Sequence, residues 1–173
     1  FFQMLEAEGN MLREHLYTWI ASGNFEAGIN FQVDQLSGLY LLVITGVGFL
    51  IHVYSVGYMD GESGYYRFFA YLNLFVFFML ILVLGDSFLL MFVGWEGVGL
   101  CSYLLIGYYF EKDSAAEAAK KAFLFNRVGD FGVLSAVLLI FLAFGSIEFS
   151  TINAEAATRL ELGGGLVKAI TLL

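Results

Sequence analysis

Four long runs of apolar residues dominate this chain and limit strongly how it can fold. They cover residues 38–57, 68–85, 88–109 and 122–147, and a fifth run begins near residue 162. At a helical rise of about 1.5 Å per residue, each complete run spans roughly 27–39 Å, enough to cross a hydrocarbon core of about 30 Å. Hydrophobic residues make up 60% of the chain and charged residues only 14%. A soluble domain carries about 25% charged residues, so we predict an all-α polytopic membrane protein, a bundle of transmembrane helices.

The segment before the first run, residues 1–35, is predicted to be an extramembrane loop that carries a β-hairpin. The sequence Ser-Gly-Asn at residues 22–24 can supply the positive-φ positions of a hairpin turn. We expect Tyr17 and Trp19 to lie at headgroup depth. The second arm has the period of a half-buried strand, with apolar side chains at alternate positions: Phe25, Ala27, Ile29, Phe31 and Val33.

Residues 36–173 are predicted to form a single transmembrane domain. The chain begins with Phe rather than Met and ends in TLL within an apolar run, so we expect a fragment with further helices on both sides. Basic residues of short loops lie mostly on the cytoplasmic side. The loops after the first and third runs hold four of them and the opposite side holds two, which favours an external hairpin: Arg67, Lys112, Lys120 and Lys121 against Arg13 and Arg159.

Composition and motifs exclude several other functions. The net charge of −8 leaves no basic face for nucleic acid. The single cysteine, Cys101, excludes an internal disulfide and an all-cysteine metal site, and we interpret it as a small core residue. The sequence has no glycine-rich phosphate loop, no Cys/His metal spacing and no Ser–His–Asp pattern. No metal or cofactor site is therefore predicted within this chain.

Glu96 is the one carboxylate inside the third run, about ten residues from its start. An ionised carboxylate at such a depth costs on the order of 3 kcal/mol, so intramembrane acids usually face a protein interior or a water path. Gly94, Gly97 and Gly99 surround it and leave room for a neighbouring helix or for water. Glu96 could be a permanently protonated packing residue. We favour a carboxyl that takes up and releases protons when a positive partner moves.

The fourth run carries Arg127 and Asp130, which are three residues apart and can pair on one helical face. Lys120 lies on the same stripe, about 10 Å nearer the helix end. We expect Lys120 to extend to the headgroups, and a relay or interhelical role is its alternative. For Arg127 and Asp130, a pair that borders a polar path and a purely structural ion pair are both open.

Three further polar residues lie in apolar runs. His52 could form an interhelical hydrogen bond or serve in a proton relay, and Asn73 is expected to link helices. Lys168, which follows the glycines at 163–165, is interpreted as an interfacial lysine.

Four sequence strings together resemble one family: GVGFLIHVYSVGYM, YRFFAYLNLFVFFMLILVL, FVGWEGVGLCSYLLIGYYF and KAFLFNRVGDFG. The chain is similar over about residues 29–145 to the distal antiporter-like membrane subunit of respiratory complex I, the proton-translocating NADH:quinone oxidoreductase. The most specific strings are GWEGVGLCSYLLIG and NRVGD. Multisubunit Na⁺/H⁺ antiporters share the fold and the glutamate, but the surrounding glycines and cysteine fit the complex I subunit better.

The resemblance implies an antiporter-like fold and a role for three residues. Glu96 matches an essential glutamate of the family's N-terminal half-channel, and Arg127 and Asp130 match the RVGD motif near that channel. The family couples this glutamate to a lysine in a GKSAQ-like motif, which this sequence lacks, so the role is not transferred to Lys168. NAD, FMN, Fe–S clusters and quinone would belong to partner subunits.

The expected setting follows from the same resemblance. The partners would be other membrane subunits, above all the neighbouring antiporter-like subunit, with the lipid bilayer and protons and without nucleic acid. The chain would be a multi-pass protein of a bacterial inner membrane, or of the mitochondrial inner membrane if eukaryotic. Two other functions stay open: a subunit of a multisubunit Na⁺/H⁺ antiporter, and a passive scaffold in which Glu96 only packs.

Overall fold

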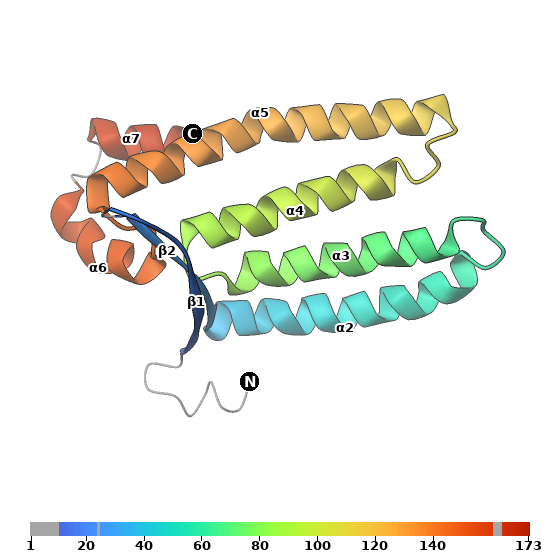
Figure 1. Ribbon diagram of the computed structural model, residues 1–173, viewed down its shortest axis with the longest axis horizontal. Coiled ribbons are helices and arrows are strands. Elements are labelled where there is room, and N and C mark those ends of the chain that lie inside the picture. The colour runs from blue at the N-terminus through green and yellow to red at the C-terminus, as the bar shows by residue number, and fades with distance from the viewer. Residues whose placement is uncertain (1–10, 24, 161–163) are drawn as a thin grey trace.

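Four long helices lie side by side in the computed structural model, which describes residues 11–23, 25–160 and 164–173. Each runs antiparallel to the one before it (Figure 1). Within the described ranges, these four helices are the ones long and apolar enough to cross a membrane. The predicted transmembrane bundle is therefore confirmed. Its helices are α2 (Gln35–Tyr58), α3 (Tyr65–Leu84), α4 (Phe88–Ile106) and α5 (Asp113–Phe144).

The helix ends depart from the ends of the apolar runs for local reasons. Helix α5 begins at Asp113, well before residue 122, because an amphipathic segment with an acid in its first turn continues directly into the apolar run. It stops at Phe144 because Gly145 adopts a φ of +71°, a left-handed conformation that ends helices. Ile147, predicted to be the last residue of the span, lies beyond this end, where its carbonyl accepts a hydrogen bond from Phe88 N.

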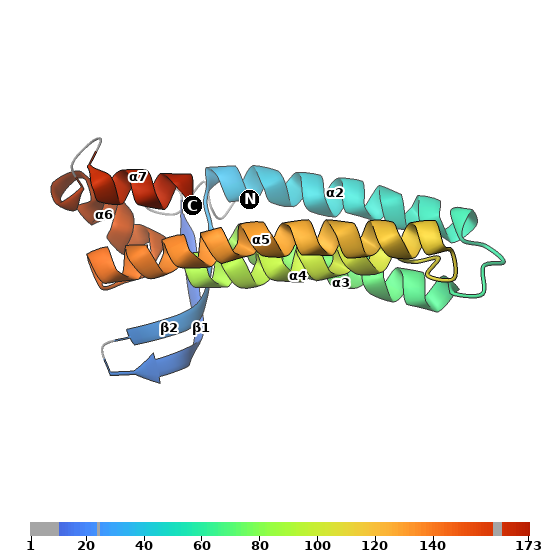
Figure 2. The same ribbon diagram turned by 90° about the horizontal axis from the view of Figure 1, so that it is seen from above.

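The predicted hairpin is present. Strands β1 (Leu12–Ser22) and β2 (Phe25–Val33) are antiparallel, and Ser22 pairs with Phe25 across the turn. Gly23 has the expected positive φ, +58°, whereas Asn24 lies outside the described residues. Figure 2 shows the hairpin projecting away from the layer of helices.

The alternation of the first arm differs from a simple period of two. The register shifts between His15 and Tyr17 and again between Thr18 and Ile20, which are positions where an extra residue bulges from the strand. Ile20 therefore pairs with the buried Ala27 and packs on the core, while Trp19 is half exposed.

The hairpin end of the molecule is joined to the helices by short contacts. Asp86 N donates to Asn30 O over 3.3 Å, and Gly85 forms an isolated bridge with Phe31. Two helices that the sequence analysis did not predict in this form complete this end: α6 (Phe149–Arg159) and α7 (Gly165–Leu172), which lies against α5. The predicted start of the fifth span, residue 162, lies outside the described residues.

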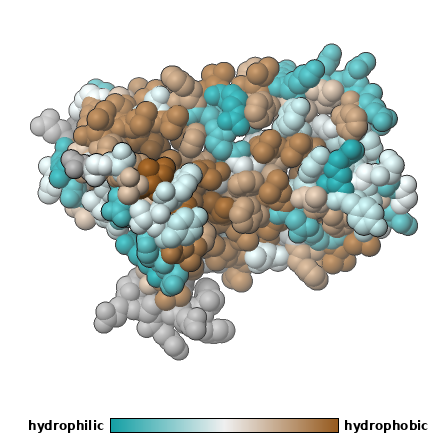
Figure 3. Space-filling view, viewed as in Figure 1, coloured by the Kyte–Doolittle hydropathy of each residue, from teal (hydrophilic) through white to brown (hydrophobic). Residues whose placement is uncertain are grey.

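Large apolar side chains cover the outer surfaces of the helices. Figure 3 shows hydrophobic colour over much of the helical region, with hydrophilic colour toward the ends and in one patch at the middle of the upper edge. Exposed apolar faces of this extent need lipid or other apolar partners around them. On α2 and α5 they include Leu39, Leu42, Phe49, Leu50, Phe125, Val128, Phe131 and Leu142.

A capping box fixes the start of α2. Ser37 N donates to Asp34 Oδ1 over 2.7 Å, and Asp34 N donates to Ser37 Oγ over 2.8 Å. The Ser37 backbone N–H stabilises the carboxylate and lowers the pKa of Asp34 below its ordinary value. The hairpin thus enters the first span at a defined residue.

Replacing Asp34 with Ala is expected to lower the free energy of unfolding by about 1 kcal/mol at neutral pH. Since the folded-state pKa lies below the unfolded value, this contribution is present above pH 3.8 and is lost as the pH falls through the folded-state pKa. Thermal unfolding of the full-length protein in detergent measures it. Asp60→Ala, in the loop after α2, is the control. Equal destabilisation by both variants would contradict the assignment.

Candidate functional site

Glu96 and Arg127 form an ion pair between α4 and α5. Arg127 Nη1 contacts Glu96 Oε2, and the two side chains are 40% and 22% exposed. The sequence left open whether Glu96 faces Arg127 or a later lysine. The fold brings Arg127 to it.

Asp130 extends this pair into a cluster of three charged groups. Its Oδ2 lies 3.8 Å from Arg127 Nη1, so the predicted pairing at three-residue spacing is present. Trp95 Nε1 donates to Asp130 Oδ1 over 2.8 Å. The Asp130 side chain is only 8% exposed, so its two oxygens are held by an indole on one side and a guanidinium on the other.

The antiparallel packing of α4 on α5 sets this geometry. Gly99 lies opposite Asn126, where an added Cβ would meet Asn126 Nδ2 at 3.8 Å. One turn further toward the loop that joins these helices, Tyr103 and Phe123 pack with ring centroids 5.4 Å apart. Phe123 also lies beneath the Arg127 guanidinium, 4.6 Å from its ring centroid to Cζ, which keeps the cation at the helix interface.

The glycines around Glu96 have different neighbours. An added Cβ at Gly94 would lie 2.5 Å from Leu82 N, and one at Gly97 would overlap the Phe78 ring. Both glycines therefore allow α3 to pack closely against α4, on the face of α4 opposite Arg127. Only Gly99 lies toward α5, so the expected room beside the carboxyl is mainly room for a helix.

Trp95 is a site residue that sequence reasoning missed. Its signal was its position directly before Glu96, because a tryptophan inside a membrane helix needs a partner for its indole N–H. The sequence also gave no sign that Asp86, outside this cluster, is a buried acid, because it lies between two apolar runs where a connecting loop is expected. It is 8% exposed, and burial raises the pKa of this carboxyl.

The structure does not bring the other predicted polar residues to the cluster. His52 Nδ1 bonds Gly48 O over 2.7 Å, and Asn73 Nδ2 donates to Phe69 O over 2.8 Å. Both bonds lie within the residue's own helix, and an interhelical role for Asn73 stays a prediction. Lys120 is exposed in the N-terminal part of α5, about two turns before Arg127. A relay role for His52 stays a prediction.

Cys101 is fully buried in α4, as expected of a core residue. Lys168 lies on α7, which packs against α5 rather than entering the Glu96 cluster.

Comparison with known families shows which family the chain belongs to. The family described as NADH-ubiquinone oxidoreductase (complex I), chain 5 N-terminus, matches residues 19–69. The family described as NADH:quinone oxidoreductase/Mrp antiporter, TM, matches residues 85–172, which include the whole charge cluster. The chain belongs to the NADH:quinone oxidoreductase/Mrp antiporter family. The resemblance to the antiporter-like subunit of complex I is thereby confirmed.

Two relatives of this family member are subunits of NADH-quinone oxidoreductases. NADH-quinone oxidoreductase subunit L of Mycobacterium tuberculosis is 50% identical over 150 residues, which cover 86% of this chain and 24% of the relative. The subunit L of Escherichia coli K12 is 47% identical over 158 residues, which cover 91% of this chain and 26% of the relative. The chain thus spans about a quarter of the length of these relatives.

Two solved structures share the fold of this family member. The Mrp complex from Dietzia sp. DQ12-45-1b matches with a TM-score of 0.79 at 24% identity, over 94% of this chain and 17% of that chain. The membrane-bound sulfane sulfur reductase, an archaeal respiratory membrane complex, matches with a TM-score of 0.72 at 22% identity, over 99% and 26%. The antiporter-like fold is therefore confirmed.

Proposed function

We propose that this chain belongs to a proton-translocating membrane subunit of an NADH:quinone oxidoreductase, in which Glu96, Arg127 and Asp130 form one part of the proton path. The observation that carries the proposal is the ion pair of Glu96 with Arg127 between two membrane-spanning helices. Charged groups at this depth are costly and mark ion paths in membrane proteins. Subunit L relatives support the same conclusion.

Arg127 is the movable cation of this mechanism. It contacts Glu96 and lies 3.8 Å from Asp130, so a small rotation of its side chain would transfer its charge from one carboxylate to the other. A nearby cation favours the ionised form of a carboxylate, and its departure favours the protonated form. The hydrogen bond from Trp95 holds Asp130 in place as the second carboxylate to which Arg127 can turn. Glu96 would then take up a proton when Arg127 turns to Asp130 and release it when Arg127 returns.

In this proposal the chain has no redox chemistry of its own. NAD, FMN, Fe–S clusters and quinone would lie in partner subunits, and the energy of quinone reduction would reach Glu96 through neighbouring membrane subunits. The neighbouring antiporter-like subunit is the first expected partner. The location would be a bacterial inner membrane, or the mitochondrial inner membrane in a eukaryote.

A multisubunit Na⁺/H⁺ antiporter is the second candidate, favoured by the fold match to an Mrp complex. Purifying the full-length protein with its partners and reconstituting it in liposomes separates the two. NADH and quinone should drive proton movement in the first case. Proton movement driven only by a Na⁺ gradient, with no NADH-dependent activity in the preparation, would establish the second.

Replacing Arg127 with Gln is expected to lower the proton-to-electron ratio about tenfold, since removing one partner leaves carboxylates uncompensated at membrane depth. Arg127→Lys should restore part of it, because the charge is kept and the planar geometry is lost. Proton pumping is measured in proteoliposomes beside NADH oxidation. Lys121→Gln, on the exposed start of α5, is the matched control. Normal pumping by Arg127→Gln would exclude the movable-cation mechanism.

A further inference from the structure

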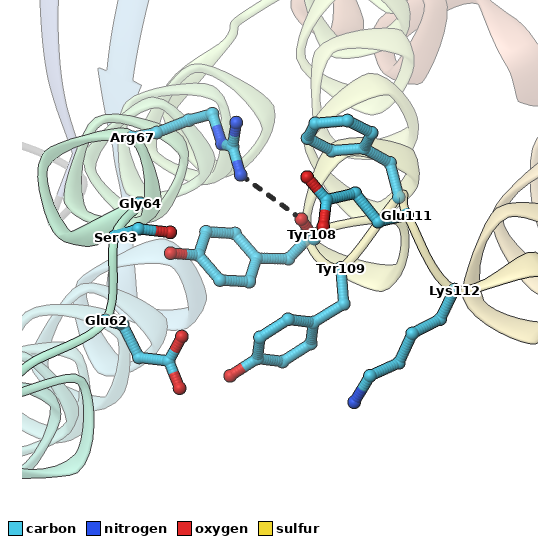
Figure 4. A pocket seen from close by; sticks show the side chains of 9 residues that line it. Glu62, Ser63, Gly64, Arg67, Tyr108, Tyr109, Glu111 and Lys112 are labelled. Atoms are coloured by element: carbon cyan, nitrogen blue, oxygen red, sulfur yellow. Dashed lines mark hydrogen bonds between the residues drawn. The ribbon is translucent and has the colours of Figure 1, made fainter.

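A polar pocket opens at the end of the helix layer opposite the hairpin. It lies between the α2–α3 loop and the α4–α5 loop, has a volume of about 180 Å³ and is distinct from the Glu96 cluster. Figure 4 shows its charged side chains arranged around two tyrosine rings. We call it the loop-end pocket and define it by six of its lining residues: Glu62, Arg67, Tyr108, Tyr109, Glu111 and Lys112.

The two cations of the loop-end pocket are held by aromatic rings. Arg67 Cζ lies 5.1 Å from the Tyr108 ring centroid and 5.0 Å from that of Phe110, and Arg67 Nη2 donates to Tyr108 O over 3.4 Å. Lys112 Nζ lies 4.7 Å from the Tyr109 ring centroid. Aromatic rings orient a cation without neutralising its charge, so both cations can bind an anion.

The charges of this pocket do not neutralise one another. Among the residues that the structure describes, no ion pair joins Glu62 or Glu111 to Arg67 or Lys112. Tyr108 is only 6% exposed, and its buried hydroxyl has no hydrogen-bond partner in the described part of the chain. A buried hydroxyl without a partner is uncommon in proteins. The pocket therefore contains two cations and two carboxylates that a ligand could bind.

We propose that the loop-end pocket binds the phosphoethanolamine head of a membrane lipid. The phosphate would accept hydrogen bonds from Arg67 and Lys112. The primary ammonium would donate to Glu62 and Glu111. The two charges of each sign match a zwitterionic head better than an anionic one, which the carboxylates would repel.

The position of the loop-end pocket fits a lipid. It lies at the ends of apolar spans, where headgroups are found, and tyrosines of the kind enriched at membrane interfaces line it. A second hollow, of about 170 Å³, shares Arg67, Tyr108 and Phe110 and continues along α3, α4 and α5 past Tyr71 and Leu104. This hollow gives the start of an acyl chain a path along the helices.

A photoactivatable phosphatidylethanolamine tests the proposal on the full-length protein in its complex, reconstituted in nanodiscs. Labelled peptides should come from the two loops, residues 58–67 and 107–112. Unlabelled phosphatidylethanolamine should compete, whereas phosphatidylcholine, whose ammonium has no N–H, and anionic phosphatidylglycerol should compete about tenfold less well. Equal competition by phosphatidylglycerol would overturn the zwitterionic assignment, and labelling elsewhere only would overturn the site.

Charge variants sharpen this test. The Arg67→Gln/Lys112→Gln variant should lower labelling about tenfold, and Lys121→Gln, outside the pocket, should not change it. The Glu62→Gln/Glu111→Gln variant should reverse the preference, so that phosphatidylglycerol competes better than phosphatidylethanolamine. Native gels establish that each variant assembles. Unchanged preference in the glutamate variant would refute the ammonium contacts. Since Glu96 is not involved, these results are independent of the proposed pumping function.

Discussion

Replacing Glu96 with Gln is expected to reduce NADH-driven proton pumping at least about tenfold, because an amide of the same shape cannot bind and release a proton. In the unmodified chain Arg127 contacts Glu96. The substitution removes this carboxylate and leaves Asp130, at 3.8 Å, as the remaining carboxylate partner of Arg127 in the cluster. Oxidation of NADH with an artificial electron acceptor should continue, since redox chemistry is assigned to partner subunits. The ratio of protons moved to NADH oxidised, measured in proteoliposomes, gives the result.

Glu117→Gln is the matched control for this variant. Glu117 is an exposed glutamate in the polar first part of α5, so the same chemical change there should leave pumping unaltered. Glu96→Asp should retain part of the activity, because the carboxylate remains but is withdrawn from Arg127. Full pumping by Glu96→Gln in an assembled complex would show that Glu96 is a packing residue, which is the scaffold alternative.

Replacing Gly94 with Ala is expected to give the largest loss of stability among the glycines of α4. The added Cβ would lie 2.5 Å from Leu82 N and 2.6 Å from Leu82 Cα. These are backbone atoms of α3, so they cannot move aside as a side chain can, and the two helices must separate. Overpacking of this kind costs roughly 1–3 kcal/mol or more. Thermal unfolding of the full-length protein in detergent measures the loss.

Gly99→Ala is the control for Gly94→Ala. At Gly99 the nearest atom to an added Cβ is Asn126 Nδ2 at 3.8 Å, an ordinary contact distance, so the change should be nearly neutral. Gly97→Ala should lie between the two, because its Cβ would meet the ring of Phe78, which can rotate. Equal stability of the Gly94 and Gly99 variants would contradict the close approach of α3 and α4 at this point.

Much of the fold could be predicted because it depends on short stretches of sequence. The apolar runs have the length of a bilayer core, and α2, α3 and α4 follow them within a few residues, while α5 begins nine residues before its run. Gly23 marked the hairpin turn through its tolerance of positive φ. The two register shifts in β1 were not predictable, since they depend on pairing with β2 and have no signal in the first strand alone.

The three charged residues of the candidate site were predictable, and the contacts between them across the helices were not. Glu96 was recognisable as an acid in an apolar run, and Arg127 and Asp130 as neighbours on one helix face. Trp95 was not recognised, because its hydrogen bond to Asp130 crosses to a residue thirty-five positions later. Asn73 donates to the backbone of its own helix, an arrangement that is always available to a short amide side chain, and its expected link between helices stays a prediction.

The sequence by itself determined which segments cross the membrane, where the hairpin turns and which ionisable groups lie inside the spans, because these properties follow from the length, polarity and spacing of neighbouring residues. Only the tertiary structure decided that Glu96 faces Arg127, that Gly94 and Gly97 face α3, and that Arg67 and Lys112 meet at one pocket. These contacts depend on the rotation and register of antiparallel helices, and apolar spans as uniform as these leave both to be set by packing.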